Sequence, residues 1–286
     1  MNLARPVVQR AAFVRGTAGS RFRLVSEPAD GNVVGTVIAA HAFAEEMNKS
    51  RRMCARMARL LAESGWRVVQ KDLLGCGDSS GDFADASWPA WVTDLEDEFA
   101  LAEPAAPVWL WGLRAGALLA SAVVARQPRA NLLLWQPVSS GAQHLQQFLR
   151  LHAGARIVGS GKAGGDTSPA QRLRAGQAVE VGGYELGPAL AAGMEQANFD
   201  LPTDFVGRVV WLEVSDNAAL SPAATRMIER LQARRLVVEA EAVAGPAFWQ
   251  TQEIEESEPL LQRSLAALML SPAPSAAAKT MNTSAA

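Results

Sequence analysis

Residues 108–120 read VWLWGLRAGALLA and join an apolar run to a helical run through the five residues GLRAG. The run PVWLW (107–111) predicts a strand that is covered on both faces, and RAGALLASAVVARQ (114–127) predicts a helix. Gly112 and Gly116 allow a tight turn in which the helix comes close to the strand. Because Arg114 stands at the centre of this turn, the stretch predicts a strand–turn–helix unit that presents a positive charge.

Similar units recur on both sides of this stretch. Short apolar runs predict strands at 35–40, 66–72, 131–137, 207–216 and 235–243. Helical patterns lie at 47–65, 88–103, 221–234 and 253–270. Residues 11–16 and 21–28 predict an antiparallel pair around a Gly/Ser turn. Since parallel neighbours need long crossovers, the order predicts an α/β fold with a mostly parallel sheet flanked by helices.

One stretch breaks the alternation. Residues 141–203 begin with a helical pattern, pass through the Gly/Ser-rich GSGKAGGD and continue to VEVGGYELGPALAAGM. An insertion late in a sheet protein is typical of a lid or cap over a binding site. We therefore expect a single domain over 1–270 with a lid or cap at about 141–203, followed by a disordered tail of small and polar residues at 271–286.

The composition excludes several classes of function. A net charge of −2 over 286 residues gives no basic field for nucleic acid. The only cysteines, Cys54 and Cys76, fit a reducing compartment, and no signal-peptide or membrane-span pattern occurs, so we expect a cytoplasmic protein. GCGDSSG (75–81) lacks dinucleotide spacing and no metal-ligand pattern occurs, so we expect neither cofactor nor metal. The oligomeric state stays open.

Three polar or Gly-rich loops follow three predicted strands: HAFAEE (41–46), DLLGCGDSSG (72–81) and GLRAG (112–116). Ligands of open α/β sheets bind at the carboxyl ends of the strands, so the loops predict one shared pocket. Cys76 is expected to pack in its turn rather than to act as a nucleophile, because a thiolate there would need a base or a cation nearby.

The order of these motifs resembles the α/β-hydrolase fold, in which a G-x-S-x-G nucleophile elbow joins strand to helix. Gly112 and Gly116 match the glycines of the elbow. The resemblance implies an oxyanion hole made by the backbone N–H groups of Ala115 and of Ala42 or Phe43. It also assigns the triad acid to Asp216, which follows the predicted strand VVWLEV.

Longer strings resemble the exosortase A system-associated hydrolase 2 family. They are HAFAEEMNKSRRMCARMARLLAESGWRVVQKDLLGCGDSSGDF (41–83), WLWGLRAGALLA (109–120), LLLWQPVSSGAQHLQQFLR (132–150) and GPAFWQTQEIEE (245–256). This resemblance implies a bacterial protein encoded with the machinery for PEP-CTERM sorting and exopolysaccharide production. It implies no settled substrate, and the name hydrolase rests on fold analogy. We expect a small-molecule substrate or an anionic ligand, and contact with that machinery.

Two members of the triad are missing. A guanidinium has no lone pair and keeps its proton, so Arg114 cannot attack a carbonyl. The histidines, His41, His144 and His152, all precede Asp216, whereas the histidine of this fold follows the acid. After the last predicted strand the sequence reads VAGPAFWQ, so that Pro246 or a neighbour fills the place of the histidine.

Two functions stay open. In an atypical hydrolase or acyl-transfer enzyme, the oxyanion-type N–H groups would polarise a carbonyl, and His41, Glu45 or Glu46 would activate water. In an inactive relative, Arg114 and the helix N-terminus would hold a carboxylate, phosphate or acidic sugar, or the fold would bind a partner protein. Arg114 either binds such an anion or forms an internal ion pair, for which we expect one of the adjacent acids Glu45 and Glu46, or Asp216, as the partner.

Overall fold

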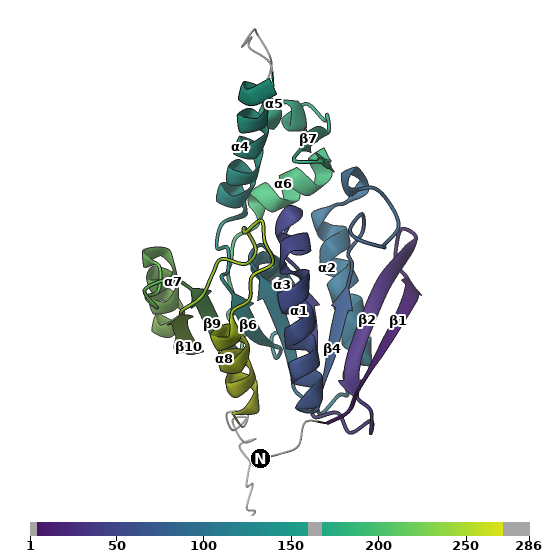
Figure 1. The fold of residues 1–286 in the computed structure, drawn as a ribbon, viewed down its shortest axis with the longest axis vertical. Coiled ribbons are helices and arrows are strands. Elements are labelled where there is room, and N and C mark those ends of the chain that lie inside the picture. Colours follow the sequence, from purple (N-terminus) through teal and green to yellow (C-terminus); the bar gives the residue numbers. More distant parts are fainter. Residues whose placement is uncertain (1–4, 160–167, 271–286) are drawn as a thin grey trace, which may run out of the picture.

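The computed structural model describes residues 5–159 and 168–270, with backbone alone for 151–159. The expected disordered tail at 271–286 lies outside these residues. The predicted fold class is confirmed: a mostly parallel sheet carries helices on both faces (Figure 1).

Within the described residues, eight strands form the main sheet in the order β1-β2-β4-β3-β5-β6-β9-β10. The predicted opening ribbon is β1 with β2, and β2 also pairs antiparallel with β4; every other pairing in this sheet is parallel. The strands are β1 (Val7–Arg15), β2 (Ser20–Pro28), β3 (Gly35–Ala40), β4 (Trp66–Lys71), β5 (Val108–Leu113), β6 (Asn131–Trp135), β9 (Arg208–Val214) and β10 (Val237–Val243). The central strands are buried on both faces, which explains their continuous apolar runs.

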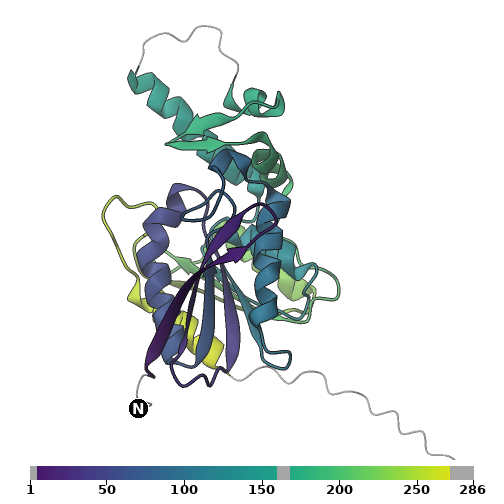
Figure 2. The ribbon, with the colours of Figure 1, turned by 90° about the vertical axis from the view of Figure 1, so that its right-hand side faces the viewer.

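The helices form two layers. Along one face run α1 (Glu45–Glu63) and α8 (Glu258–Met269), and the other face carries α2 (Trp88–Glu96), α3 (Gly116–Val124) and α7 (Pro222–Ala233). Figure 2 places α1 and α2 on opposite sides of the strands. In α1 the residues Met47, Met53, Met57 and Leu61 are buried at helical spacing, so one apolar stripe faces the sheet.

Two predicted helices differ at their ends. The pattern at 88–103 becomes α2 followed by a 3₁₀ helix at Asp97–Leu101. The pattern at 253–270 becomes a helix only from Glu258, because the side chain of Ser257 caps it by accepting from the N–H of Leu260 at 3.4 Å.

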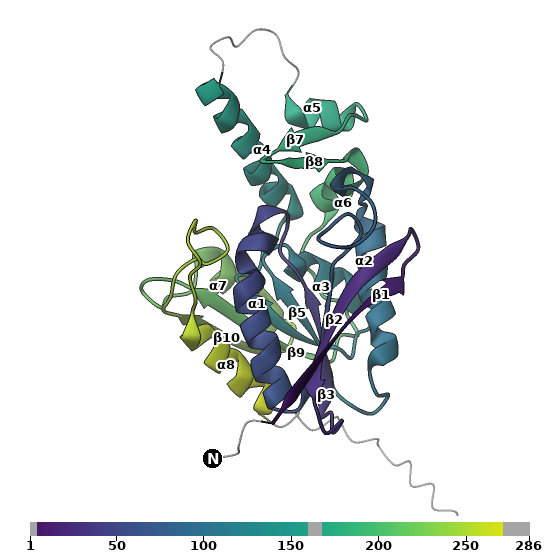
Figure 3. The same ribbon diagram turned by 45° about the vertical axis from the view of Figure 1, so that its right-hand side comes forward.

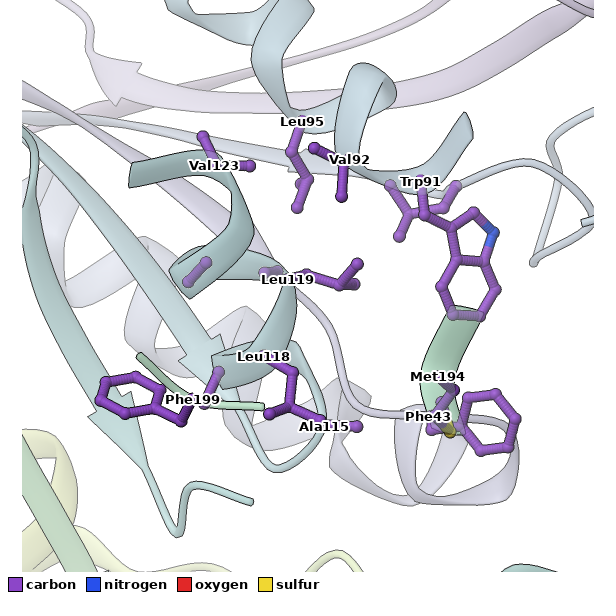
Figure 4. Packing of buried hydrophobic residues seen from close by; sticks show 14 of the residues in the cluster. Phe43, Trp91, Val92, Leu95, Ala115, Leu118, Leu119, Val123, Met194 and Phe199 are labelled. Carbon is purple, nitrogen blue, oxygen red and sulfur yellow. The ribbon is translucent and has the colours of Figure 1, made fainter. Parts of the chain in front are cut away.

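The described parts of the insertion, residues 141–159 and 168–203, lie beyond the carboxyl ends of the parallel strands (Figure 1). It contains α4 (Gly141–Gly159), α5 (Pro169–Arg174), a hairpin of β7 (Val179–Val181) and β8 (Tyr184–Leu186), and α6 (Pro188–Gln196). A Cβ at Gly193 would overlap Trp88 of α2, and one at Gly187 would overlap the carbonyl of Ala84, so glycines let α6 approach closely. Figure 4 shows Met194 of α6 near Phe43 and Trp91, inside the core cluster.

Candidate functional site

The elbow turn holds Arg114 in the left-handed region, at φ 54°. This conformation costs a residue other than glycine about 1–2 kcal/mol. The glycines beside it have a steric reason: a Cβ at Gly112 would lie 2.7 Å from the Cα of Ala117, and one at Gly116 would overlap the carbonyl oxygen of Ala40. The turn therefore brings α3 directly against the end of β3. Its central residue has the strained positive φ of a nucleophile elbow, although Arg114 is not a nucleophile.

The oxyanion-type donors lie in the loop after β3 and at the start of α3. Within residues 5–159 and 168–270, the backbone N–H groups of Ala42, Phe43 and Ala115 donate no hydrogen bond to another backbone or side chain. Ala115 also begins α3, where the helix dipole favours negative charge. The arrangement offers donors to an anion or a carbonyl oxygen.

The side chain of Phe43 is buried among aromatic rings. It is 3% exposed, and its ring lies 5.0 Å from that of Phe148 on α4 and 5.5 Å from that of Phe83. The rings of Trp91 and His144 are each 6.0 Å away. Aromatic contacts thus join the loop after β3 to the insertion.

Three groups surround the guanidinium of Arg114. Its Nε donates to Glu46 Oε1 at 3.1 Å, and its Nη1 donates to the carbonyl of Gln136 at 3.4 Å. Its Cζ lies 5.5 Å from the ring centroid of Trp249, a cation–π contact. Only 14% of the Arg114 side chain and 18% of the Glu46 side chain are exposed, so the charge at the elbow is largely compensated within the chain.

Of the acids expected to pair with Arg114, Glu46 is the partner, whereas Glu45 and Asp216 are not. Glu45 is exposed and accepts from the hydroxyl of Tyr184 in β8, and Asp216 is exposed in the loop after β9. The reason is the start of α1: Glu45 and Glu46 both lie in its first turn, about 100° apart around the axis, and Glu46 alone faces the elbow.

Glu46 is an unusual carboxylate. Burial raises its pKa above the usual value, and the attraction of Arg114 offsets this only in part. Its Oε2 is buried and has no hydrogen-bond partner among the described residues. His144 Nε2 of α4 lies 3.8 Å from this oxygen, and burial, with repulsion from Arg114, lowers the pKa of His144 to about 4. His144 is therefore neutral at pH 7.

His41 is held by its own loop. Its Nδ1 lies 2.8 Å from the carbonyl oxygen of Ala42, and since a carbonyl only accepts, Nδ1 carries the proton. Burial lowers the pKa of His41, so its Nε2 is a bare acceptor, without a partner in the described part of the chain. For His152, whose side chain is outside the described residues, nothing follows.

Cys76 packs in its turn, as expected from the sequence. It is 6% exposed, and burial raises the pKa of its thiol to about 12, with Asp72 adding to the rise. Asp72 organises this loop, since it accepts from the N–H of Asp78 at 3.0 Å and its carbonyl accepts from the hydroxyl of Ser79 at 2.5 Å. The loop 72–81 is therefore braced by its own hydrogen bonds.

Sequence reasoning missed three residues of this site: Gln136, His144 and Trp249. Trp249 lies in the segment VAGPAFWQ, where the histidine of the fold was sought, and its ring rather than an imidazole reaches the elbow. Gln136 follows β6 at φ 43°, a conformation with no sequence signal for a residue other than glycine. No helix among the described residues is long and apolar enough to span a membrane.

Comparisons with known proteins agree with the fold. Residues 31–168 match the family described as Hydrolase_4, serine aminopeptidase, S33. The search of curated proteins gave no match.

Several solved structures have the same fold. Est1E from Butyrivibrio proteoclasticus with bound ferulic acid is 14% identical, with a TM-score of 0.60 over 90% of this chain and 98% of its own. A thermostable carboxyl esterase from Bacillus coagulans is 12% identical, with a TM-score of 0.61 over 91% and 98%. An alpha-beta serine hydrolase homologue from Coxiella burnetii is 15% identical, with a TM-score of 0.52 over 91% and 97%. By its sheet order, its elbow and these comparisons, the chain is an α/β-hydrolase-fold protein.

Proposed function

We propose that this chain is a non-hydrolytic binding protein of the α/β-hydrolase fold that recognises an anionic group at its elbow. The observation that carries the proposal is Arg114 itself, which replaces a nucleophile by a fixed cation and contacts Glu46 and Trp249. Arg114 has no lone pair with which to attack, and Trp249 stands where a proton-accepting histidine would be needed. The degenerate triad supports binding over turnover.

The elbow can accept an anion in spite of Glu46. The guanidinium has five N–H donors, of which two donate to Glu46 and Gln136. The N–H of Ala115, at the start of α3, has no hydrogen-bond partner among the described residues. An anion bound there repels the Glu46 carboxylate, whose pKa is already raised. Protonation of Glu46 then leaves the charge of Arg114 to the ligand, so binding takes up a proton and strengthens as the pH falls.

The ligand class follows from these donors. A carboxylate, a phosphate or an acidic sugar presents oxygens that match a guanidinium and backbone N–H groups. The strings shared with the exosortase A system-associated hydrolase 2 family support a role beside PEP-CTERM sorting and exopolysaccharide machinery in a bacterium. A cytoplasmic location goes with this proposal, and the insertion at 141–203 would act as the lid over the bound group.

The test is a thermal-shift series with sodium sulfate against sodium chloride at equal ionic strength. Sulfate should raise the unfolding temperature of the wild type, more at pH 6 than at pH 8, and should have no such effect on Arg114→Met. Arg126→Met is the matched control, because Arg126 is an exposed arginine paired with Glu96. Equal stabilisation of the wild type and Arg114→Met would reject the elbow as the anion site.

A second function has one observation in its favour. Among the residues that the structure describes, the buried Oε2 of Glu46 has no hydrogen-bond partner and lies beside the neutral His144, and the oxyanion-type N–H groups donate to no other group. Such a carboxylate could activate a water against a carbonyl in an atypical hydrolase or acyl-transfer reaction. Ester, thioester and amide panels decide the matter: turnover that Glu46→Gln abolishes and Glu45→Gln spares would establish catalysis and overturn the binding proposal.

A further inference from the structure

The strand β1 forms one edge of the main sheet. Among the described residues it pairs with β2 alone, and it does so along its whole length. Figures 1 and 3 show the ribbon of β1 and β2 at the outside of the sheet. An edge strand carries backbone N–H and C=O groups that face no neighbouring strand. Such a row of groups is a template on which another strand can pair.

The backbone groups that point outwards follow from hydrogen bonds at the two ends of the ribbon. At one end the N–H of Gly16 donates to the carbonyl of Gly19 at 2.9 Å, and at the other end the N–H of Ala29 donates to the carbonyl of Pro6 at 2.8 Å. Bonded pairs alternate with non-bonded pairs along an antiparallel ladder. The even-numbered residues of β1 therefore bond to β2, and the odd-numbered residues point their backbone groups to the free edge. The outward residues are Val7, Gln9, Ala11, Phe13 and Arg15.

Contacts within the ribbon agree with this assignment. Phe22 lies opposite Phe13, and its carbonyl accepts from the N–H of Asp72, after β4, at 3.0 Å, so its backbone bonds on the side away from β1. The rings of Phe13 and Phe22 are 5.7 Å apart, and Gln9 Nε2 donates to Ser26 Oγ at 3.0 Å. Side chains approach most closely in non-bonded pairs, as these two pairs do. The outward N–H and C=O groups have no hydrogen bond in the described part of the chain.

The sequence of β1 is permissive for pairing. The strand reads VVQRAAFVR, without proline, glycine or an acid, and the side chain of Phe13 is 65% exposed. The opposite edge of the sheet is different, because β10 carries Glu239 and Glu241, both of which are paired with Arg263. Charged side chains on an edge strand discourage pairing between sheets. Of the two edges, β1 is therefore the one suited to an added strand.

We propose that β1 pairs with β1 of a second copy of this chain, antiparallel and about a two-fold axis that passes through Ala11. With this axis Val7 faces Arg15 of the second copy, Gln9 faces Phe13, and Ala11 faces Ala11. All five outward residues then take part, and each bonded pair exchanges two hydrogen bonds. The same surface serves both copies, as a two-fold interface requires, and one sheet runs through the dimer.

The charges select this axis and this occupant. An axis through Arg10 would place Arg10 directly opposite Arg10 of the second copy, which is destabilising. An axis through Ala12 would move Val7 out of the ladder and against the turn at Thr17. The axis through Ala11 sets both arginines opposite uncharged residues. An acidic peptide is a weaker candidate for this edge, because Arg10 is already paired with Glu27 of β2.

This surface is separate from the elbow. Three strands, β2, β4 and β3, lie between β1 and β5, which leads into the elbow turn. The anion proposal can therefore fail without affecting this one, and Arg114→Met should form the dimer as the wild type does.

Sedimentation equilibrium over a series of protein concentrations measures the pairing. The wild type should form a dimer. Ala11→Pro removes the central N–H of both copies and should raise the dissociation constant at least about tenfold, since two hydrogen bonds are lost. The variant should keep its fold, because the N–H of Ala11 points away from β2 and proline is tolerated at such positions of edge strands.

A charge pair tests the position of the axis and does not depend on the proline variant. Ala11→Glu and Ala11→Lys each place like charges opposite one another, so each alone should weaken the dimer about fivefold. Their equimolar mixture should form a heterodimer at least as tight as the wild-type dimer. The matched controls Ala233→Glu and Ala233→Lys, at an exposed alanine of α7, should dimerise as the wild type does.

Three results would overturn the proposal. The first is a wild type that stays monomeric, whether its edge is empty or covered by another segment of the chain, which hydrogen exchange of the odd-numbered amides of β1 distinguishes. The second is a dimer that Ala11→Pro leaves unchanged, because the copies would then meet at another surface. The third is a Glu/Lys mixture that associates no more tightly than either variant alone.

Discussion

Replacing Arg114 by methionine removes the cation beside Glu46 and keeps a side chain of similar length at the same strained backbone position. The stranded carboxylate has two options: to stay charged without a partner, or to take up a proton. The loss of folding free energy from the unpaired carboxylate cannot exceed the free energy of protonating it. At pH 7 that is 1.36 × (7 − 4.5), or about 3.4 kcal/mol, from the usual glutamate pKa of 4.5. Loss of the Trp249 contact adds about 0.5–1 kcal/mol.

We therefore expect Arg114→Met to lower the free energy of unfolding by about 2–4 kcal/mol at pH 7. The sign of the pH dependence follows from linkage. Glu46 has its folded pKa raised, so the native state holds a proton that the unfolded state has lost, and stability falls as the pH rises from 4.5 to the folded pKa. Without Arg114 the folded pKa of Glu46 rises further, so the pH range over which stability falls extends to higher pH. Relative to the wild type, the variant therefore loses up to about 2.7 kcal/mol (1.36 × 2) more free energy of unfolding at pH 7 than at pH 5.

His144 acts in the same direction. Its pKa is lowered by burial and by Arg114, so the wild type loses stability as the pH falls from 6.5 towards 4. Without Arg114 this loss is smaller, so the difference in free energy of unfolding between the variant and the wild type is smaller at pH 5 than at pH 7.

Urea unfolding at pH 5 and pH 7 measures both effects. The double variant Arg114→Met/Glu46→Gln should return to within about 1 kcal/mol of the wild type, because uncharged replacements for a buried pair are often neutral. Arg126→Met, in an exposed pair, should cost about 1 kcal/mol or less at both pH values. A deficit of Arg114→Met that is equal at pH 5 and pH 7, or a double variant less stable than the single one, would refute the reasoning.

Three further predictions follow from single features. With thiol pKa values of about 12, only about one thiol in 10⁴ of Cys54 and Cys76 is ionised at pH 8, so iodoacetamide should alkylate them far more slowly in the folded chain than in urea; equal rates would show them accessible. Gly116→Ala, whose Cβ would overlap the carbonyl of Ala40, should lose more than about 3 kcal/mol in urea unfolding, and near-wild-type stability would contradict the close packing of the elbow. Arg114→Ser restores a hydroxyl but no base, and should stay unlabelled by a fluorophosphonate probe; labelling would reveal an unrecognised base.

The strands and most helices could be predicted because their buried positions are apolar and recur at the spacing of a strand or a helix. The run GTVIAA became β3, with all six residues buried, and the methionine and leucine spacing after residue 45 became the buried stripe of α1. The glycines of GLRAG predicted the turn correctly, since a tight approach excludes a Cβ whatever the rest of the chain does.

The partners of Arg114 could not be predicted from such patterns. The choice between Glu45 and Glu46 depends on where α1 begins, because one residue rotates a side chain by about 100°. Trp249 reaches the elbow from a loop that lies 135 residues further along the chain, and neither periodicity nor composition encodes that path. The contacts of Arg114 depend on which distant loops the fold brings together, whereas the GLRAG motif identifies Arg114 alone.

A crystal structure of the protein grown with selenate, an anomalously scattering analogue of sulfate, tests the central claim most directly. The account predicts an anomalous peak within hydrogen-bond distance of the Arg114 guanidinium and the N–H of Ala115, with the Glu46 carboxylate displaced or protonated. An elbow without selenate, in crystals at pH 6 where Arg114 still lies between Glu46 and Trp249, would contradict it.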